Sequence, residues 1–185
     1  AFSMIKQREL HECNELFELL SHPSVFPFVR QKAKTADEFW FMTSQLMEDE
    51  ENGKVVSRTI TDDWGQPIGT ITLYDVQDGA GFLGTWIGAP YQGKGYNQKA
   101  KELFLKELFF ELDFQCVFLK IRKENTKSLR AASKLGYVMD AKESHPSLYE
   151  EINKGEKQFE LLKIQRDTFY FYMATQKNAS AEQAM

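Results

Sequence analysis

Two glycines flank a lysine in the stretch GAPYQGKGY, residues 88–96 of a 185-residue chain. Glycine accepts positive φ and lets a ligand come close to the backbone, and Lys94 adds positive charge. Backbone N–H groups at the start of a helix attract phosphate oxygens. The spacing therefore predicts a loop that holds a phosphate ligand. The plain alternative is a loop whose glycines only turn the chain.

The same stretch comes within one residue of a nucleotide-triphosphate P-loop, G-x-x-x-x-G-K-[ST]. Gly95 stands where a P-loop needs Ser or Thr to hold magnesium. The next β-prone run, CVFLKIRKEN at residues 116–125, ends without the metal-binding aspartate of a Walker B strand. Both omissions argue against an NTPase and favour a pyrophosphate held without a metal.

The loop needs a strand before it and a helix after it, and the pattern of apolar residues supplies both. The runs that we expect to be strands are residues 4–8, 54–62, 66–76, 81–88, 116–121, a short run around Val138, and the very apolar residues 167–174. The runs that we expect to be helices are residues 9–20, 35–52, 96–112 and 125–135. Residues 54–88 therefore form an antiparallel meander, followed by helix, strand, helix and final strands.

Local signals sharpen these boundaries. Pro23 and Pro27 predict an irregular bend between the first two helices, and Gly53 ends the second helix. Asn125 begins the helix that follows residues 116–121, and Gly136 lies just past its end as a C-cap.

Composition sets the class of protein. Hydrophobic residues make up 42% and charged residues 27%, as in a packed globular domain, and we expect a single domain over residues 1–185. Residues 1–3 precede Met4 and are expected to be a cloning remnant, and residues 175–185 a frayed tail.

The formal net charge of −4 argues against a nucleic-acid partner, and no apolar run is long enough to span a membrane. Cys13 and Cys116 lie far apart, which predicts buried thiols in the cytoplasm rather than a disulfide framework or a metal site.

The central stretch, from Gly84 to Tyr137, resembles the GNAT superfamily of acyl-CoA-dependent N-acyltransferases, closest to the RimJ and RimL type of ribosomal-protein N-terminal acetyltransferases. QGKGYN, residues 92–97, is similar to the family's [QR]-x-x-G-x-[GA] pyrophosphate loop. The residues that lead into this loop, W-I-x-x-P-Y-Q from Trp86, are similar to the corresponding residues of the RimJ and RimL branch. Asn125-x-x-Ser128 followed by Lys134-Leu135-Gly136-Tyr137 is similar to N-x-x-S…K-x-G-[FY].

The resemblance implies the GNAT fold, an α/β protein with a mixed sheet, and acetyl-CoA as cosubstrate with no metal. The residues that it implies for cofactor binding are Trp86 and Ile87 beside the pantetheine arm, Gln92, Gly93, Lys94, Gly95, Tyr96 and Asn97 at the pyrophosphate, and Asn125, Ser128 and Lys134. Asn97 replaces the small last residue of the loop motif. Asn125 equally well caps a helix.

The implied reaction is direct attack of a primary amine on the acetyl carbonyl, which needs a base for the amine and an acid for the leaving thiolate. Ala132 stands where many members carry the acid tyrosine, and Lys120 where some carry a glutamate base. Ser128 is our candidate acid, with Asn125 beside it at the thioester. The candidate bases are Asp75, Asp78, Glu124 and His22, with a chain of waters as the alternative.

The acceptor is either a protein N-terminus or a small molecule, and the fold implies that residues 24–34 and 144–158 line its pocket. Glu150 and Glu151 could attract a cationic acceptor, although a charged surface loop is the plainer interpretation. The missing tyrosine and glutamate leave a second hypothesis open, a domain that binds acyl-CoA without turnover. Members of the family also commonly pair edge strands, so a homodimer is a further expectation.

Overall fold

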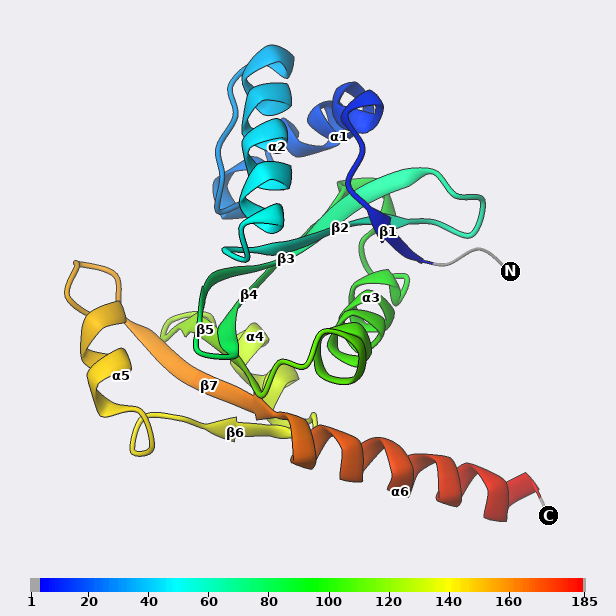
Figure 1. Cartoon of the computed structure of the whole chain (residues 1–185), viewed down its shortest axis with the longest axis vertical. Coiled ribbons are helices and arrows are strands. Elements are labelled where there is room, and N and C mark those ends of the chain that lie inside the picture. The colour runs from blue at the N-terminus through cyan, green and yellow to red at the C-terminus, as the bar shows by residue number, and fades with distance from the viewer. Residues whose placement is uncertain (1–3, 185) are drawn as a thin grey trace. The chain divides into compact units, whose positions relative to one another are not determined.

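The structure is a computed structural model that describes the backbone of residues 4–184 and the side chains of residues 4–176 (Figure 1). The strands are β1 Ile5–Gln7, β2 Val56–Thr61, β3 Pro67–Gln77, β4 Ala80–Ile87, β5 Cys116–Arg122, β6 Val138–Asp140 and β7 Phe159–Gln165. The α-helices are α1 Cys13–Leu20, α2 Ala36–Glu51, α3 Tyr96–Lys106, α4 Thr126–Ser133, α5 Pro146–Ile152 and α6 Arg166–Ala184. Short 3-10 turns cover Leu10–Glu12, Phe26–Phe28 and Ala89–Tyr91.

The seven strands follow the order β1-β2-β3-β4-β5-β7-β6, and the chain divides into two compact units. Unit 1 holds Ala1–Asp78 and Leu83–Asp113, and unit 2 holds Gly79–Phe82 and Phe114–Met185. The expected α/β fold with a mixed sheet is confirmed: an antiparallel meander precedes β5, α4 and a final antiparallel strand pair. The cloning remnant expected at residues 1–3 lies outside the described residues. No helix within the described residues combines the length and the apolar character that a bilayer span requires.

In unit 1 the meander is covered on both sides. β1 pairs with β2, opposing Ile5 to Ile60, and β2 pairs with β3, opposing Ser57 to Thr72. Every residue of β2 is buried, because α1 and α2 lie on one side of these strands and α3 on the other (Figure 1). Four of the six residues of β2 are nonetheless polar, and the side chains of Ser57 and Arg58 are satisfied by hydrogen bonds to Thr72, Glu107 and Glu50.

Helix α2 begins and ends where its capping residues predict. The Thr35 side chain accepts a hydrogen bond from the Glu38 N–H at 3.1 Å, and Asp37 and Glu38 place negative charge in the first turn. At the other end Gly53 takes a φ of 74°, which a residue with a side chain seldom adopts.

The segment between α1 and α2, residues 21–35, is irregular as predicted, with one 3-10 turn at Phe26–Phe28. It is nonetheless anchored, because Val25, Val29 and Ala33 are at most 5% exposed. They join a hydrophobic cluster with α1 and the start of α2, and Trp86 and Ala89 pack against that cluster. The segment is therefore held against the end of β4.

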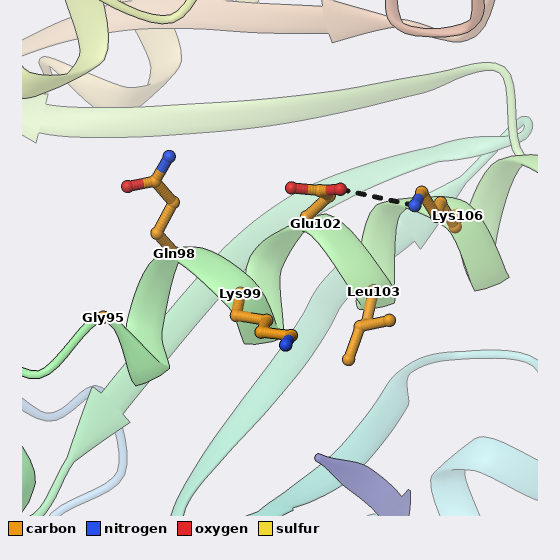
Figure 2. Close-up of a pocket in the computed structure, with 6 residues that line it drawn as sticks. All are labelled: Gly95, Gln98, Lys99, Glu102, Leu103 and Lys106. Atoms are coloured by element: carbon orange, nitrogen blue, oxygen red, sulfur yellow. Dashed lines mark ion pairs between the residues drawn. The ribbon is translucent and has the colours of Figure 1, made fainter. Parts of the chain in front are cut away.

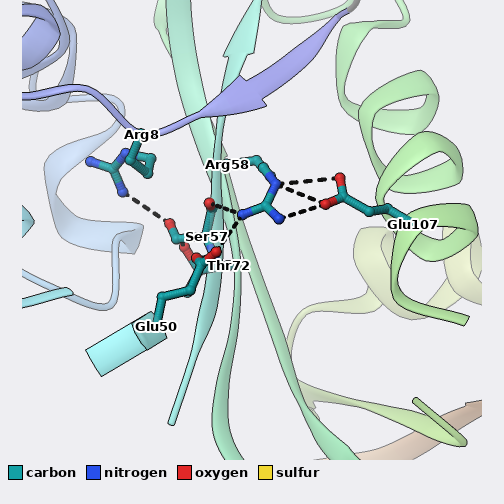
Figure 3. Close-up of polar contacts among 6 residues, drawn as sticks. All are labelled: Arg8, Glu50, Ser57, Arg58, Thr72 and Glu107. Atoms are coloured by element: carbon teal, nitrogen blue, oxygen red, sulfur yellow. Dashed lines mark hydrogen bonds and ion pairs between the residues drawn. The ribbon is translucent and has the colours of Figure 1, made fainter. Parts of the chain in front are cut away.

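The helix predicted over residues 96–112 consists of α3 followed by a π-helical turn at Glu107–Glu111. The Arg58 side chain on β2 bonds Glu107 at 3.0 Å from Nε and Glu50 of α2 at 2.9 Å from Nη1 (Figure 3). Burial opposes the charged guanidinium, but these hydrogen bonds outweigh it and raise the Arg58 pKa above its ordinary value. One arginine thus ties α2, β2 and the end of α3 together.

In unit 2, β5 is central. It runs parallel to Ala80–Phe82 of β4 and antiparallel to β7, and β6 pairs with the other edge of β7. Val117, Leu161 and Ile164 of these strands are at most 2% exposed. Helix α4 connects β5 to β6, in the order that the sequence predicted.

The strand predicted over residues 167–174 is wrong, because those residues are helical and belong to α6. The final strand is β7, within a stretch that carries alternating charges. Phe169 is fully buried, whereas Tyr170 is 63% and Phe171 72% exposed, which matches one inward face of a helix. A short continuous apolar run shows neither the helical nor the strand periodicity. Only the packing of its side chains in the fold shows that it is a helix.

Two finer expectations are also corrected. Helix α4 ends at Ser133 with Lys134 in the capping position, and Gly136 is not among the glycines with positive φ. Gly136 is instead required by space, because a Cβ there would lie 2.7 Å from Cε2 of Tyr172 on α6. Glu150 and Glu151, for which a charged surface loop is the plainer interpretation from the sequence, lie instead in α5, which begins at Pro146. Fraying of residues 175–185 stays a prediction.

Candidate active site

The end of β4 leads into the glycine loop, residues 92–97, through a tight turn. The Gly88 N–H donates to the Ile68 carbonyl of β3 at 2.8 Å, and the Tyr91 N–H donates to the Gly88 carbonyl at 2.9 Å. The Gln92 side-chain amide donates to the Ile87 carbonyl at 2.9 Å. This bond closes the turn, so the strand end and the loop are fixed to each other.

Positive φ values give the loop its shape. Gly93 has φ 76° and Gly95 has φ 85°, and Gly95 occupies the N-cap position of α3. A Cβ at either glycine would meet nothing within 4 Å, so backbone conformation, and not crowding by the protein, explains the choice of glycine. The space in front of both residues is open to a ligand.

The N–H groups of this loop are available. Within the described part of the chain, no acceptor is recorded for the backbone N–H groups of Gly93, Lys94 and Gly95. The first turn of α3 carries no acidic residue, and Lys94 is exposed. Unpaired N–H groups, the helix dipole and a lysine all favour an anion here, which fits a pyrophosphate.

A hollow of about 340 Å³ begins at this loop and continues along α3 (Figure 2). Its lining residues are Gly95, Gln98, Lys99, Glu102, Leu103 and Lys106. Lys106 is ion-paired with Glu102 at 3.3 Å, whereas the Lys99 ammonium in Figure 2 points away from that pair. The motif at residues 92–97 does not include Gln98 and Lys99. Their i+3 and i+4 spacing from Gly95 on a helix could have predicted that they lie beside the loop.

Trp86 and Ile87 are held in place by their neighbours. A Cβ on Gly69 of β3 would lie 2.2 Å from the Trp86 carbonyl oxygen, so β3 and β4 approach closely at this point. A Cβ on Gly88 would lie 2.9 Å from the Leu19 side chain of α1. Glycines on both sides therefore fix the position of the strand end that precedes the loop.

In unit 2, Asn125 and Ser128 are brought together. The Asn125 side-chain oxygen accepts a hydrogen bond from the Ser128 N–H at 3.1 Å, which confirms Asn125 as the N-cap of α4. Ser128 is partly exposed, and no hydrogen bond of its hydroxyl is recorded among the described residues. The hydroxyl is therefore available for other chemistry.

Lys134 belongs to a basic face of α4. With Thr126, Lys127, Arg130 and Ala131 it lines a hollow of about 340 Å³. Lys127 and Arg130 did not stand out in the motif, yet their spacing from Lys134, one cation per turn, places all three on one helix face. The face carries no acidic residue, so it suits a phosphate.

The candidate bases have different surroundings. Glu124 is ion-paired with Arg122 at 2.6 Å, and His22 Nδ1 accepts the Ser24 N–H at 3.1 Å, which leaves the proton of a neutral ring on Nε2. Asp75 and Asp78 are exposed and adopt φ values of 51° and 53°. Asp75 lies within β3, next in sequence to the buried Tyr74.

The residues at the two positions that depart from the family pattern make structural contacts. Ala132 is 6% exposed, and the Lys120 ammonium lies 5.1 Å from the ring centroid of Phe159. Elsewhere, Glu9, His11 and Glu12 bring ligand atoms within 4.8 Å of one another. Lys6 Nζ lies 3.0 Å from Glu9 and 3.1 Å from Glu12, so an ammonium already supplies the cation for these carboxylates.

Comparisons with known proteins agree with this geometry. The acetyltransferase (GNAT) domain family matches residues 5–138, and the chain belongs to this family. No protein of curated function matches the chain significantly.

Solved structures share the fold. RimJ of Mycobacterium smegmatis, in complex with CoA-disulfide, matches with a TM-score of 0.71 at 14% identity over 92% of this chain and 88% of that one. Spermidine N-acetyltransferase of Vibrio cholerae, in complex with CoA and spermine, matches with a TM-score of 0.70 at 13% identity over 90% and 96%. FdhC, a nucleotide-linked sugar GNAT, matches with a TM-score of 0.73 at 16% identity over 94% and 92%.

Proposed function

We propose that this protein is an acetyl-CoA-dependent N-acetyltransferase that acts on a primary amine, either a protein N-terminus or a small molecule. The observation that carries the proposal is the glycine loop, with two left-handed glycines, unpaired N–H groups and open space at the start of α3. Membership of the GNAT family supports it, as do the CoA complexes of two proteins with the same fold.

The proposal gives roles to residues of the glycine loop, of the end of β4 and of α4. Gly93, Lys94, Gly95 and the first turn of α3 hold the pyrophosphate, and Trp86 and Ile87 offer backbone groups at the end of β4. Lys127, Arg130 and Lys134 add positive charge for a phosphate. When bound, acetyl-CoA supplies the thioester carbonyl that an amine can attack.

Two protons must move in the reaction. The amine loses one as its nitrogen bonds to carbon, and we assign its acceptance to Asp75, directly or through water. The sulfur gains one as the carbon–sulfur bond breaks, and we assign its donation to the Ser128 hydroxyl. Thioester aminolysis needs little beyond positioning and deprotonation, so the absence of the usual tyrosine and glutamate is compatible with turnover.

The alternative is a domain that binds acyl-CoA without turnover, and the departures at Ala132 and Lys120 favour it. Two measurements separate the hypotheses: calorimetric titration with CoA, and thiol release from acetyl-CoA across a panel of polyamines, amino acids and peptides. An enzyme gives both binding and amine-dependent thiol release. CoA binding without thiol release in the presence of any amine would leave only the non-catalytic hypothesis. We also propose that the protein acts in the cytoplasm, since both described cysteines are free thiols.

A further inference from the structure

The guanidinium of Arg30, in the segment between α1 and α2, lies over an aromatic ring. Its guanidinium carbon lies 4.1 Å from the centroid of Tyr74, which is 8% exposed on β3. The ring attracts the positive charge of a guanidinium in this position, and the N–H groups of the guanidinium can still donate to another acceptor. Within the described residues no carboxylate lies within ion-pair distance of Arg30, so these donors are available.

The segment as a whole is positively charged. Residues 21–35 contain Arg30, Lys32 and Lys34 and no acidic residue, in a chain of net charge −4. The Lys32 ammonium already has hydrogen-bond partners within the segment. It donates to the Val29 carbonyl at 2.7 Å and to the Pro27 carbonyl at 3.2 Å. Arg30 differs, because the ring of Tyr74 holds it while its polar donors remain unused.

Contacts connect Arg30 to the strand that leads into the glycine loop. A Cβ on Gly84 of β4 would lie 3.3 Å from Cε1 of Tyr74, so the ring that carries Arg30 rests against β4 two residues before Trp86. The same segment packs against Trp86 through the cluster that contains Val25 and Val29. Arg30 is therefore tied to β4 through Tyr74, and its segment packs against Trp86 near the end of that strand.

We propose that Arg30 selects an acceptor amine that also carries a carboxylate, such as a peptide N-terminus with Asp or Glu in its first residues. This inference rests on the proposed function, in which Trp86 and Ile87 at the end of β4 lie beside the bound acetyl-CoA. A planar guanidinium binds a carboxylate through two parallel hydrogen bonds, and an unpaired cation repels a polyamine. The spermine bound by the Vibrio cholerae protein is, in contrast, a polycation.

The test compares peptides that differ in one residue. Thiol release is measured with Ser-Glu, Ser-Gln and Ser-Lys peptides of otherwise equal sequence, with free glutamate and with spermidine. The wild-type protein should prefer the acidic peptide about 10- to 100-fold in kcat/KM over its neutral counterpart, because one charge-assisted pair differs between them. Turnover of free glutamate instead of the peptide would support the selection of a carboxylate by Arg30 and would identify the acceptor as a small acidic amine.

Two variants show whether the preference belongs to Arg30. Arg30→Met keeps an apolar chain over Tyr74 and should abolish the acidic preference, chiefly through a higher KM, while turnover of the neutral peptide is retained. Lys34→Met removes the same charge from the same segment and should leave the preference intact. Equal turnover of acidic and neutral peptides by the wild-type protein, or an equal loss on both in Arg30→Met, would refute the inference. Absence of thiol release with every amine would overturn the proposed function and the inference together.

Discussion

The side-chain oxygen of Asn125 accepts a hydrogen bond from the backbone N–H of Ser128 at 3.1 Å. The contact uses the backbone of Ser128 and leaves its hydroxyl unused, so the capping and catalytic roles can be separated by mutation. Ser128→Ala should keep the cap and the stability of the fold while lowering kcat at least tenfold. Asn125→Ala should cost about 1 kcal/mol of stability through the lost cap. A Ser128→Ala variant with the wild-type rate would remove Ser128 from the mechanism.

A bulky residue in the glycine loop should abolish CoA binding. Gly95→Val places a β-branched side chain at a φ of 85°, at a cost of about 1–3 kcal/mol, and fills the open space in front of the loop. Gly53→Val is the matched control, because Gly53 has a φ of 74° and also has nothing within 4 Å of an added Cβ. Both variants should lose similar stability in urea titrations, but only Gly95→Val should lose CoA binding by calorimetry. Equal affinity of the two variants for CoA would show that the pyrophosphate does not bind at the glycine loop.

The ion pairs of Arg58 should contribute more to stability than a surface pair on the same helix. Glu107→Gln removes one carboxylate from an arginine side chain that is 5% exposed, and we expect a loss of about 2 kcal/mol in the free energy of unfolding. Glu102→Gln is the control, since Glu102 and Lys106 are more than 40% exposed and their pair should be worth less than about 0.5 kcal/mol. Chemical denaturation at neutral pH measures both, and equal losses would contradict a structural role for Arg58.

Protonation of His145 should weaken the folded state in mild acid. Burial against Phe118, at 4.9 Å between ring centroids, and the nearby Lys163 ammonium lower the His145 pKa below its ordinary value of 6.5. The unfolded chain therefore binds the proton more tightly, and stability should fall as the pH drops from about 7 to about 5. His145→Gln should make the free energy of unfolding depend less steeply on pH in this range. An unchanged slope in denaturant titrations would show that His145 is not the group responsible.

Local signals were sufficient for most elements and for both motifs. Thr35, Gly53 and Asn125 mark helix ends because capping depends on groups within four residues of one another, and the glycine loop is recognisable for the same reason. The apolar run at residues 167–174 is helical and not the predicted strand, because a short run of this kind fits a buried strand or one face of a helix equally well. Gly136 is not the predicted helix cap. Glycine is needed there because the ring of Tyr172, far along the sequence, leaves no room for a side chain.

The sequence by itself was enough to predict the glycine loop at residues 92–97 and to establish the capping role of Asn125 and the membership of an acetyltransferase family, because these depend on residue types at short spacing. Tertiary structure alone decided that Arg58 joins Glu50 to Glu107 and that Arg30 rests on Tyr74. Charges far apart in sequence find partners only through the folding of the strands and helices between them. The acceptor proposed for this enzyme depends on such a contact, and no local motif could have indicated it.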